Sequence, residues 1–184
     1  MKDSRPPRRH FFTQLTAMLA LLIPHPSVSA PSRRSVPFGK RYVTGADSDN
    51  LSCLVDIGEI PASARWRTAT SAGYDFWVVP GLPAPLDERN NPAEDWKPVN
   101  RAPRGGIIGR LITWAPGFEY PMHTTPTLDF IVVVSGRLEL RLQKETQVLG
   151  PGYVLVQRAT AHSWRNPGPE PCTFVGVMID AAQQ

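Results

Sequence analysis

Histidine is scarce in this sequence. Only four of the 184 residues are histidines, and two of them, His10 and His25, lie close to the N-terminus. Any chemistry that requires an imidazole in the rest of the chain must therefore use His123 or His162. Both residues fall within one stretch, residues 117–166, and we expect the functional site there.

Cysteine is scarcer still, with only Cys53 and Cys172. A disulfide could join them in an exported protein, but the sequence does not define a pairing. We expect two free, half-buried thiols.

Long apolar runs are also absent. The longest near the N-terminus, residues 15–23, is too short to cross a bilayer of roughly 30 Å as a helix. Within residues 1–30 it follows a basic start and precedes small residues, which is typical of a cleaved targeting signal. Arg8 and Arg9 resemble a twin-arginine export signal, which predicts a periplasmic or secreted protein. An organellar transit peptide, or a basic extension on a cytoplasmic protein, remains an alternative.

The excess of positive charge is confined to one end of the chain. The formal net charge is +4, but residues 1–41 hold eight basic residues and one acidic residue, giving +7. The remaining 12 basic and 15 acidic residues give −3. We therefore expect no nucleic-acid partner. The length suits a single domain, which we place at residues 41–184 after a linker at 31–40.

Short strands separated by turns dominate the body, and no amphipathic helix is evident. The clearest alternation places Leu138, Leu140 and Leu142 on one face with charged residues between them, which predicts an antiparallel sheet with one wet face. The apolar run before the turn at Ser135 and Gly136 is interpreted as one strand, and the leucine segment after the turn as a second strand. Further strands are expected at 41–45, 51–57, 74–79, 153–157 and 172–179, and one within 107–117.

A proline-rich segment interrupts this pattern. Residues 80–105 hold six prolines and lack an apolar period. A segment of this length could cover an opening in the domain or could be a passive surface connection. We expect Trp96 to hold it against the body.

Five residues of the histidine-containing stretch keep a spacing known from one family. Gly117, His123, Thr125, Asp129 and Gly136 fall at the intervals of the first cupin motif, G-x5-H-x-H-x3,4-E-x6-G. Thr125 replaces the second histidine and Asp129 replaces the glutamate. The stretch therefore resembles the cupin superfamily in the spacing of its motif residues, but two of the ligand positions of the motif hold other residue types.

The second cupin motif, G-x5-P-x-G-x2-H-x3-N, is matched at His162 and Asn166. Gln157 stands for its proline, Ala159 for its glycine, and Gly152 lies one residue closer. The resemblance selects the jelly-roll barrel, or double-stranded β-helix, among all-β folds, with its core at residues 105–181.

The finer pattern resembles a narrower group of small single-domain cupins encoded beside fungal polyketide synthases, with relatives in bacteria. The resemblance is carried by HTT at 123–125, TLDF at 127–130, and VLVQRATAHSWRNPGPEPC at 154–172. Members of that group are generally described as cupin-domain oxidoreductases of polyketide tailoring. Thr125 and Asp129 are expected residues in that group, whereas Ala159 and Tyr153 depart from it.

The resemblance implies that His123, Asp129 and His162 converge at the mouth of the barrel as metal ligands and catalytic residues. Two imidazoles and one carboxylate favour Fe(II), and Zn or Mn could also bind. Without a metal, Asp129 and a histidine would form an acid/base pair. The candidate pocket residues around them are Thr125, Trp164, Phe130, Tyr120 and Asn166.

Three functions follow from these features. The favoured one is a metal-dependent oxidoreductase or oxygenase that acts on a polyketide-type aromatic or alkyl small molecule in secondary-metabolite biosynthesis. The second is a decarboxylase-like lyase or isomerase of a similar substrate. The third is a non-catalytic cupin that binds a small molecule. Cupins commonly pair through sheet edges, so the resemblance also implies a homodimer.

Overall fold

The computed structural model of the protein describes residues 39–86 and 95–182, and its regular structure is almost entirely β. Across these two ranges the one helical element is the short 3-10 helix η1 (Ala62–Ala64), and no helix could cross a membrane. These features confirm the predicted all-β class. The expected targeting segment at 1–30 lies outside the described residues, as does nearly all of the linker.

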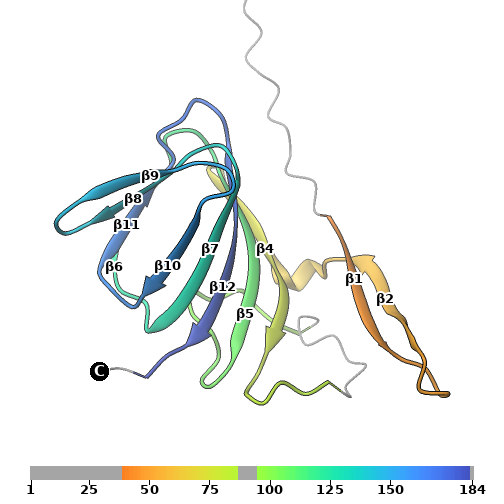
Figure 1. Cartoon of the computed structure of the whole chain (residues 1–184). Coiled ribbons are helices and arrows are strands. Elements are labelled where there is room, and N and C mark those ends of the chain that lie inside the picture. Colours follow the sequence, from red (N-terminus) through yellow and green to blue (C-terminus); the bar gives the residue numbers. More distant parts are fainter. Residues whose placement is uncertain (1–38, 87–94, 183–184) are drawn as a thin grey trace, which may run out of the picture. The chain divides into compact units, whose positions relative to one another are not determined.

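The described strands form three antiparallel sheets (Figure 1). A two-stranded sheet pairs β1 (Lys40–Ala46) with β2 (Ser52–Glu59). The larger sheet has the order β10 (Val154–Arg158), β7 (Thr127–Ser135), β12 (Cys172–Asp180), β5 (Ile107–Trp114), β4 (Ser71–Val79), β3 (Arg65–Arg67). The smaller sheet has the order β6 (Glu119–His123), β11 (His162–Arg165), β8 (Leu138–Leu142), β9 (Thr146–Leu149).

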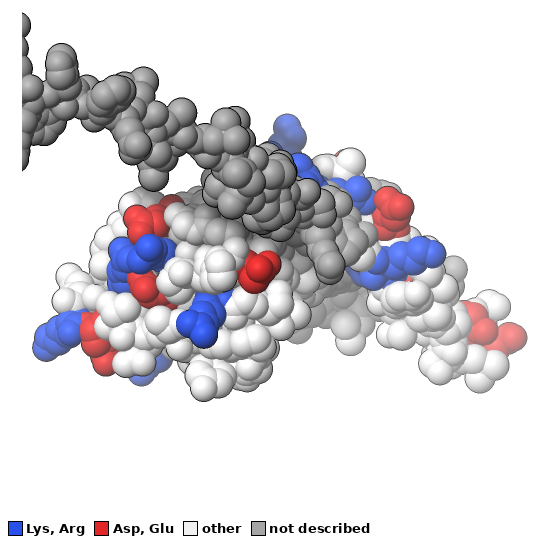
Figure 2. Space-filling model, turned by 90° about the horizontal axis from the view of Figure 1, so that it is seen from above, with Lys and Arg blue, Asp and Glu red and all other residues white. Residues whose placement is uncertain are grey.

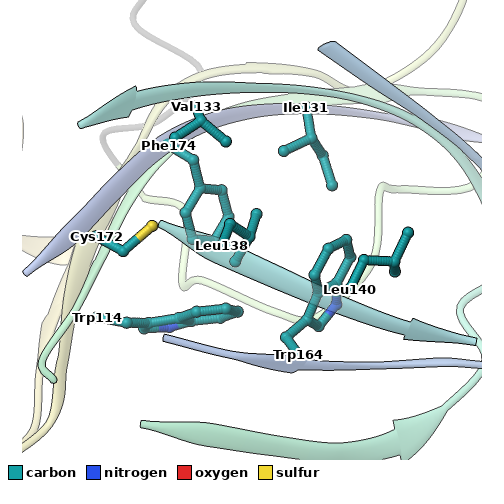
Figure 3. Packing of buried hydrophobic residues seen from close by; sticks show 8 residues of the cluster. All are labelled: Trp114, Ile131, Val133, Leu138, Leu140, Trp164, Cys172 and Phe174. Carbon is teal, nitrogen blue, oxygen red and sulfur yellow. The ribbon is translucent and has the colours of Figure 1, made fainter. Parts of the chain in front are cut away.

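The six-stranded and four-stranded sheets share one hydrophobic core, which makes them the two walls of a jelly-roll barrel. Figure 3 shows this core with side chains from both sheets packed against one another. Its buried members are Trp114, Ile131, Val133, Leu138, Leu140, Trp164, Cys172 and Phe174. Burial of such apolar surface is the main favourable contribution to folding. The jelly-roll prediction is confirmed.

Strand alternation decides which side chains enter the barrel. In β7, Asp129, Ile131 and Val133 are buried, whereas Phe130 and Val132 are exposed on the outer face. Successive side chains of a strand point to opposite faces, so a buried carboxylate and an exposed phenyl ring can be neighbours in sequence.

The two strands predicted around Ser135 and Gly136 are present, but they do not pair with each other. β7 pairs with β10 and β12, whereas β8 pairs with β11 and β9. The chain therefore crosses between the two sheets at Gly136, which has a φ of 76°. A Cβ at this position would lie 2.5 Å from the Pro171 carbonyl oxygen, so the crossing requires glycine.

Both cysteines are free, as predicted. Cys53 is partly exposed, but Cys172 is completely buried, which is deeper than the half-buried position expected from sequence. Burial raises the pKa of the Cys172 thiol to about 11. Cys172 is therefore a packing residue of the barrel core.

Charged residues of both signs share the described surface. Figure 2 shows Lys and Arg side chains interspersed with Asp and Glu side chains on the face that it displays. Three of the ion pairs lie on the smaller sheet: Arg141 with Glu139 within β8, Arg165 with Glu119 between the neighbouring strands β11 and β6, and Arg141 with Glu119 from β8 across β11 to β6.

The turn between β10 and β11 contains a backbone conformation that suits glycine. Ala159 has a φ of 51°, in the left-handed region, and its amide donates to the Thr127 carbonyl at 3.1 Å. This conformation costs an L-residue roughly 1–2 kcal/mol. The cost explains why the cupin motif carries glycine at this place.

We predict that Ala159→Gly raises the free energy of unfolding by about 0.5 kcal/mol. Glycine removes the strain of the left-handed conformation, and this gain is larger than the stability lost because glycine makes the unfolded chain more flexible. Urea denaturation measures the change. Ala161→Gly is the matched control, since Ala161 is not in the left-handed region, and it should lower the free energy of unfolding. A lower stability for Ala159→Gly would contradict the strain.

Candidate functional site

A cavity in the barrel has walls from both sheets. Its volume is about 120 Å³, and it opens to solvent at its mouth. Much of the lining is apolar or aromatic: Ile112, Trp114, Tyr120, Ile131, Trp164, Phe174 and Met178. The polar lining residues are Asn100, Arg110, His123, Thr125, Asp129 and His162.

Strand register brings the two histidines together. β11 pairs with β6 so that His162 lies directly opposite His123, and their ring centroids are 4.3 Å apart at an interplanar angle of 58°. The two residues are 39 positions apart in sequence, so only the sheet places them side by side. The structure thus brings together the two imidazoles that the sequence singled out.

The His123 ring has a defined hydrogen-bond partner. Its Nδ1 lies 2.8 Å from the Pro121 carbonyl oxygen. A carbonyl oxygen can only accept a hydrogen bond, so Nδ1 carries the proton and the neutral ring leaves Nε2 with a lone pair. Such a tautomer is typical of histidines that bind metals through Nε2.

The His162 ring is held in the same tautomer by the turn that precedes β11. Its Nδ1 lies 2.7 Å from the Thr160 carbonyl oxygen and 2.7 Å from the Gln157 amide nitrogen. Gln157 Nε2 already donates to the Thr160 carbonyl oxygen and hydroxyl, at 2.8 and 2.9 Å, which accounts for its two hydrogens. The Thr160 carbonyl oxygen can only accept a hydrogen bond, so this contact requires the proton on Nδ1. Burial lowers the pKa of His162, so the ring favours the neutral form.

Asp129 enters the same cavity from the opposite sheet. It is 6% exposed, and its Oδ1 atom is buried with no hydrogen-bond partner among the described residues. Burial raises the pKa of Asp129, and the Thr127 hydroxyl, Arg110 and His123 oppose this shift in part. The carboxyl group can thus either hold a proton or accept a positively charged partner.

His123, His162 and Asp129 are side chains of types that bind metals, but they do not lie together as one group of ligands. Imidazoles and a carboxylate with an unpartnered oxygen are ligands that divalent transition metals accept. Within residues 39–86 and 95–182, however, no three His, Cys, Asp or Glu side chains lie close enough to hold a metal ion. Metal binding by His123, Asp129 and His162 therefore stays a prediction. The two histidines are in contact with each other.

Three predicted pocket residues line the cavity. Tyr120 packs edge-on against His123 with centroids 4.7 Å apart, and Trp164 packs edge-on against His162 at 5.1 Å. Thr125 also lines the cavity, on the same side as His123. Asn100 Nδ2 donates to the Tyr120 hydroxyl at 3.0 Å, which links the proline-rich segment to this wall.

Two predicted pocket residues lie elsewhere, and for these the prediction is wrong. Phe130 is 39% exposed on the outer face of β7, because Asp129 takes the inward position. Asn166 is fully buried beyond the end of β11, where its Nδ2 donates to the carbonyl oxygens of Trp114 and Glu170 at 3.1 and 2.9 Å. Asn166 therefore holds a loop in place and does not line the cavity.

Sequence reasoning missed a charged pair on the cavity wall. Arg110 of β5 is 7% exposed, and its Nε lies 3.1 Å from Oδ1 of Asp75, which is fully buried on β4. The two residues are cross-strand neighbours. The sequence contained a signal for this pair: each of the two apolar runs, 74–79 and 107–114, holds one charged residue, and the two charges are opposite. Charged residues are rarely buried unless they are paired, so a contact between them could have been expected.

The proline-rich segment forms a hydrogen bond with each member of this pair. Trp96 Nε1 donates to Asp75 Oδ2 at 2.7 Å, and Arg110 Nη2 donates to the Val99 carbonyl oxygen at 2.7 Å. Trp96 therefore holds this segment against the body, as predicted. Burial raises the pKa of Asp75 and lowers that of Arg110, and each partner opposes the shift of the other. An arginine guanidinium keeps its positive charge in proteins, and Asp75 is the counter-ion of Arg110.

We predict that Asp75→Asn lowers the free energy of unfolding by about 3 kcal/mol, because it leaves the Arg110 guanidinium buried without its counter-ion. The double variant Asp75→Asn/Arg110→Met should recover most of this loss. Thermal and urea unfolding of both variants measure the difference. Equal stability of wild type and Asp75→Asn would show that the pair does not stabilise the fold.

Comparisons with known proteins agree with this architecture. The family model described as Cupin domain matches residues 110–179. The Oryzines biosynthesis cluster protein J of Aspergillus oryzae is 40% identical over 143 residues, covering 73% of this chain and 78% of that protein. The cupin-domain-containing oxidoreductase fogC of Aspergillus ruber is 40% identical over 148 residues, covering 76% and 71%.

Among solved structures, the Cnp3 cupin domain of Schizosaccharomyces pombe aligns over 77% of this chain and 87% of its own length, with 10% identity and a TM-score of 0.47. The two fungal relatives match most of their own length as well as most of this chain. The chain therefore belongs to the cupin superfamily, in the group that contains these fungal cupin-domain proteins.

Proposed function

We propose that this chain is a cupin oxidoreductase of secondary-metabolite biosynthesis that acts on a small polyketide-type aromatic or alkyl molecule inside the barrel. The observation that carries the proposal is the contact between His123 and His162, both with Nδ1 engaged by a backbone carbonyl. The relatives support it, because one is named an oxidoreductase and another is named for a biosynthesis cluster.

The proposed activity includes a divalent metal, with Fe(II) favoured and Zn or Mn as alternatives. His123 and His162 would bind it through their Nε2 atoms, and Asp129 would supply the third donor. When bound, iron in such a site supplies redox chemistry with molecular oxygen as the oxidant. The unpartnered Oδ1 atom of Asp129 supports its role, because a buried carboxylate oxygen without a partner is costly.

The remaining cavity residues would bind and orient the substrate. Tyr120 and Trp164 each stand edge-on to one of the two imidazoles, so an aromatic or alkyl substrate packed against them would lie beside both rings. Thr125 stands two positions after His123, where many cupins have another histidine. Its hydroxyl can donate or accept a hydrogen bond to substrate without adding a charge.

A second candidate function is a lyase or isomerase that moves protons and consumes no oxygen. It is favoured by the opposite pKa shifts of two groups in one cavity, since burial raises the pKa of Asp129 and lowers that of His162. A protonated carboxyl at Asp129 and a neutral His162 would form a donor and an acceptor. A cupin that only binds its ligand would need neither a proton donor nor a proton acceptor in the cavity.

We predict that the purified full chain contains close to one equivalent of metal, and that His123→Ala and His162→Ala each lose most of it, because each removes one of two adjacent imidazole ligands. Plasma mass spectrometry of protein prepared without chelators measures the content. Tyr120→Phe is the matched control, since it keeps the ring and has no metal-binding role; its metal content should match wild type.

The same preparations separate the candidate functions. Iron that is lost in both histidine variants, together with oxygen uptake in the presence of polyketide-type phenols, would support the oxidoreductase. Zinc or manganese without oxygen uptake would favour the lyase or isomerase. Wild-type protein that is folded but stays free of metal after reconstitution would contradict metal-dependent catalysis.

A further inference from the structure

We infer that the cavity selects ligands that carry a carboxylate, and that Arg110 is the residue that recognises it. This inference rests on the proposed function, because it specifies the class of small molecule that the barrel would accept. It predicts an apolar or aromatic acid as the substrate, with its anionic end at the larger sheet and its body between the two sheets. The sequence motifs of the site do not include Arg110.

Arg110 brings a positively charged side chain to the wall that the larger sheet gives the cavity. Asp75, Arg110 and Gly176 lie side by side on β4, β5 and β12. Arg110 lines the cavity, whereas Asp75 is fully buried and does not. A ligand in the cavity can therefore contact Arg110, whereas Asp75 is out of its reach.

The hydrogen bonds of the pair leave part of the guanidinium available. Trp96 and Arg110 both donate to Asp75 Oδ2, at 2.7 and 3.3 Å, which satisfies that oxygen. Arg110 Nη2 also donates to the Val99 carbonyl oxygen. Within residues 39–86 and 95–182, Nη1 of Arg110 forms no hydrogen bond. A guanidinium with a donor group free beside an apolar cavity is suited to a carboxylate.

Gly176 provides space for such a ligand. It is the inward-facing residue next to Arg110, and a Cβ placed on it would have Arg110 Cγ at 3.7 Å as its only near neighbour. A larger side chain here would occupy the space beside the guanidinium. The absence of a side chain therefore keeps one flank of Arg110 open to the cavity.

The other charges of the cavity are compatible with an anionic ligand. Asp129 is the one acidic residue of the lining, and the proposed function assigns it to a divalent metal, whose charge exceeds that of the carboxylate. The walls beyond Arg110 are aromatic or apolar, with Trp114, Phe174 and Trp164 among them. A ligand with one anionic end and an apolar body matches this distribution of charge.

The test compares two probes of nearly equal shape, trans-cinnamate and trans-cinnamamide, by ligand-observed NMR titration of the full chain at pH 7. We expect wild-type protein to bind the carboxylate about 10- to 100-fold more tightly than the amide, which is the usual contribution of a hydrogen bond to a charged group. In Asp75→Asn/Arg110→Met this preference should disappear while the affinity for the amide stays within about threefold. Arg137→Met, which removes an exposed arginine, is the control and should keep the preference.

A second variant leaves the ion pair intact in case the double variant does not fold. Gly176→Val fills the space beside Arg110 and should weaken binding of cinnamate at least about tenfold, since the charge-assisted contact is lost. Equal affinity of wild type for the two probes, or unchanged cinnamate binding by Gly176→Val, would overturn the inference.

Metal content measured on the same samples separates this inference from the proposed function. A preference for cinnamate that survives in Asp75→Asn/Arg110→Met at unchanged metal content would show that the metal binds the carboxylate, and would overturn the role of Arg110. A preference that is lost in that variant, in protein that never contains metal, would support Arg110 and contradict the metal-dependent function.

Discussion

The pairing of β11 with β6 is the constraint on which the candidate site depends. It sets His162 opposite His123, although the two histidines belong to different motifs of the chain. β11 in turn pairs with β8, whose leucines belong to the barrel core, so the histidine register is fixed by apolar packing. A shift of one residue would turn His162 and Trp164 of β11 away from the cavity. Core packing and site geometry are therefore the same property of this sheet.

The second determinant is the backbone that surrounds each imidazole. Carbonyl oxygens two residues before each histidine, those of Pro121 and Thr160, accept the Nδ1 proton, so each ring is oriented by its own strand or turn. Gln157 donates to the carbonyl and hydroxyl oxygens of Thr160 and so closes the turn that precedes His162. The left-handed Ala159 lies inside that turn, so local strain is found where a functional ring is positioned.

The fold and the histidine pair could be predicted from sequence because both depend on spacing. Alternation identified the strands, and the motif intervals identified His123 and His162. Asp75 and Arg110 could not be paired in this way, because their contact arises from a cross-strand register that local pattern does not define. Phe130 was misplaced because aromatic character alone does not show which face of β7 it occupies. The partners of β7 and β8 were also beyond prediction, since the turn at Gly136 joins two sheets and not a hairpin.

The charged pair gives the proline-rich segment its place in the site. Trp96 and Val99 bond to Asp75 and Arg110, and Asn100 bonds to Tyr120, so three contacts within five residues tie this segment to the two walls of the cavity. A segment without regular structure thus helps to order both the guanidinium and an aromatic ring beside His123. The cavity depends on three parts of the chain: the two sheets and this segment.

The tautomers of His123 and His162 provide the most direct measurement of the central claim. Long-range nitrogen–proton NMR correlation of the imidazole rings, assigned with the two histidine-to-alanine variants, should show a protonated Nδ1 and an unprotonated Nε2 for both residues in metal-free protein at pH 8. A proton on Nε2 of either ring would contradict the claim that the backbone carbonyls prepare both imidazoles to act through Nε2 in the cavity.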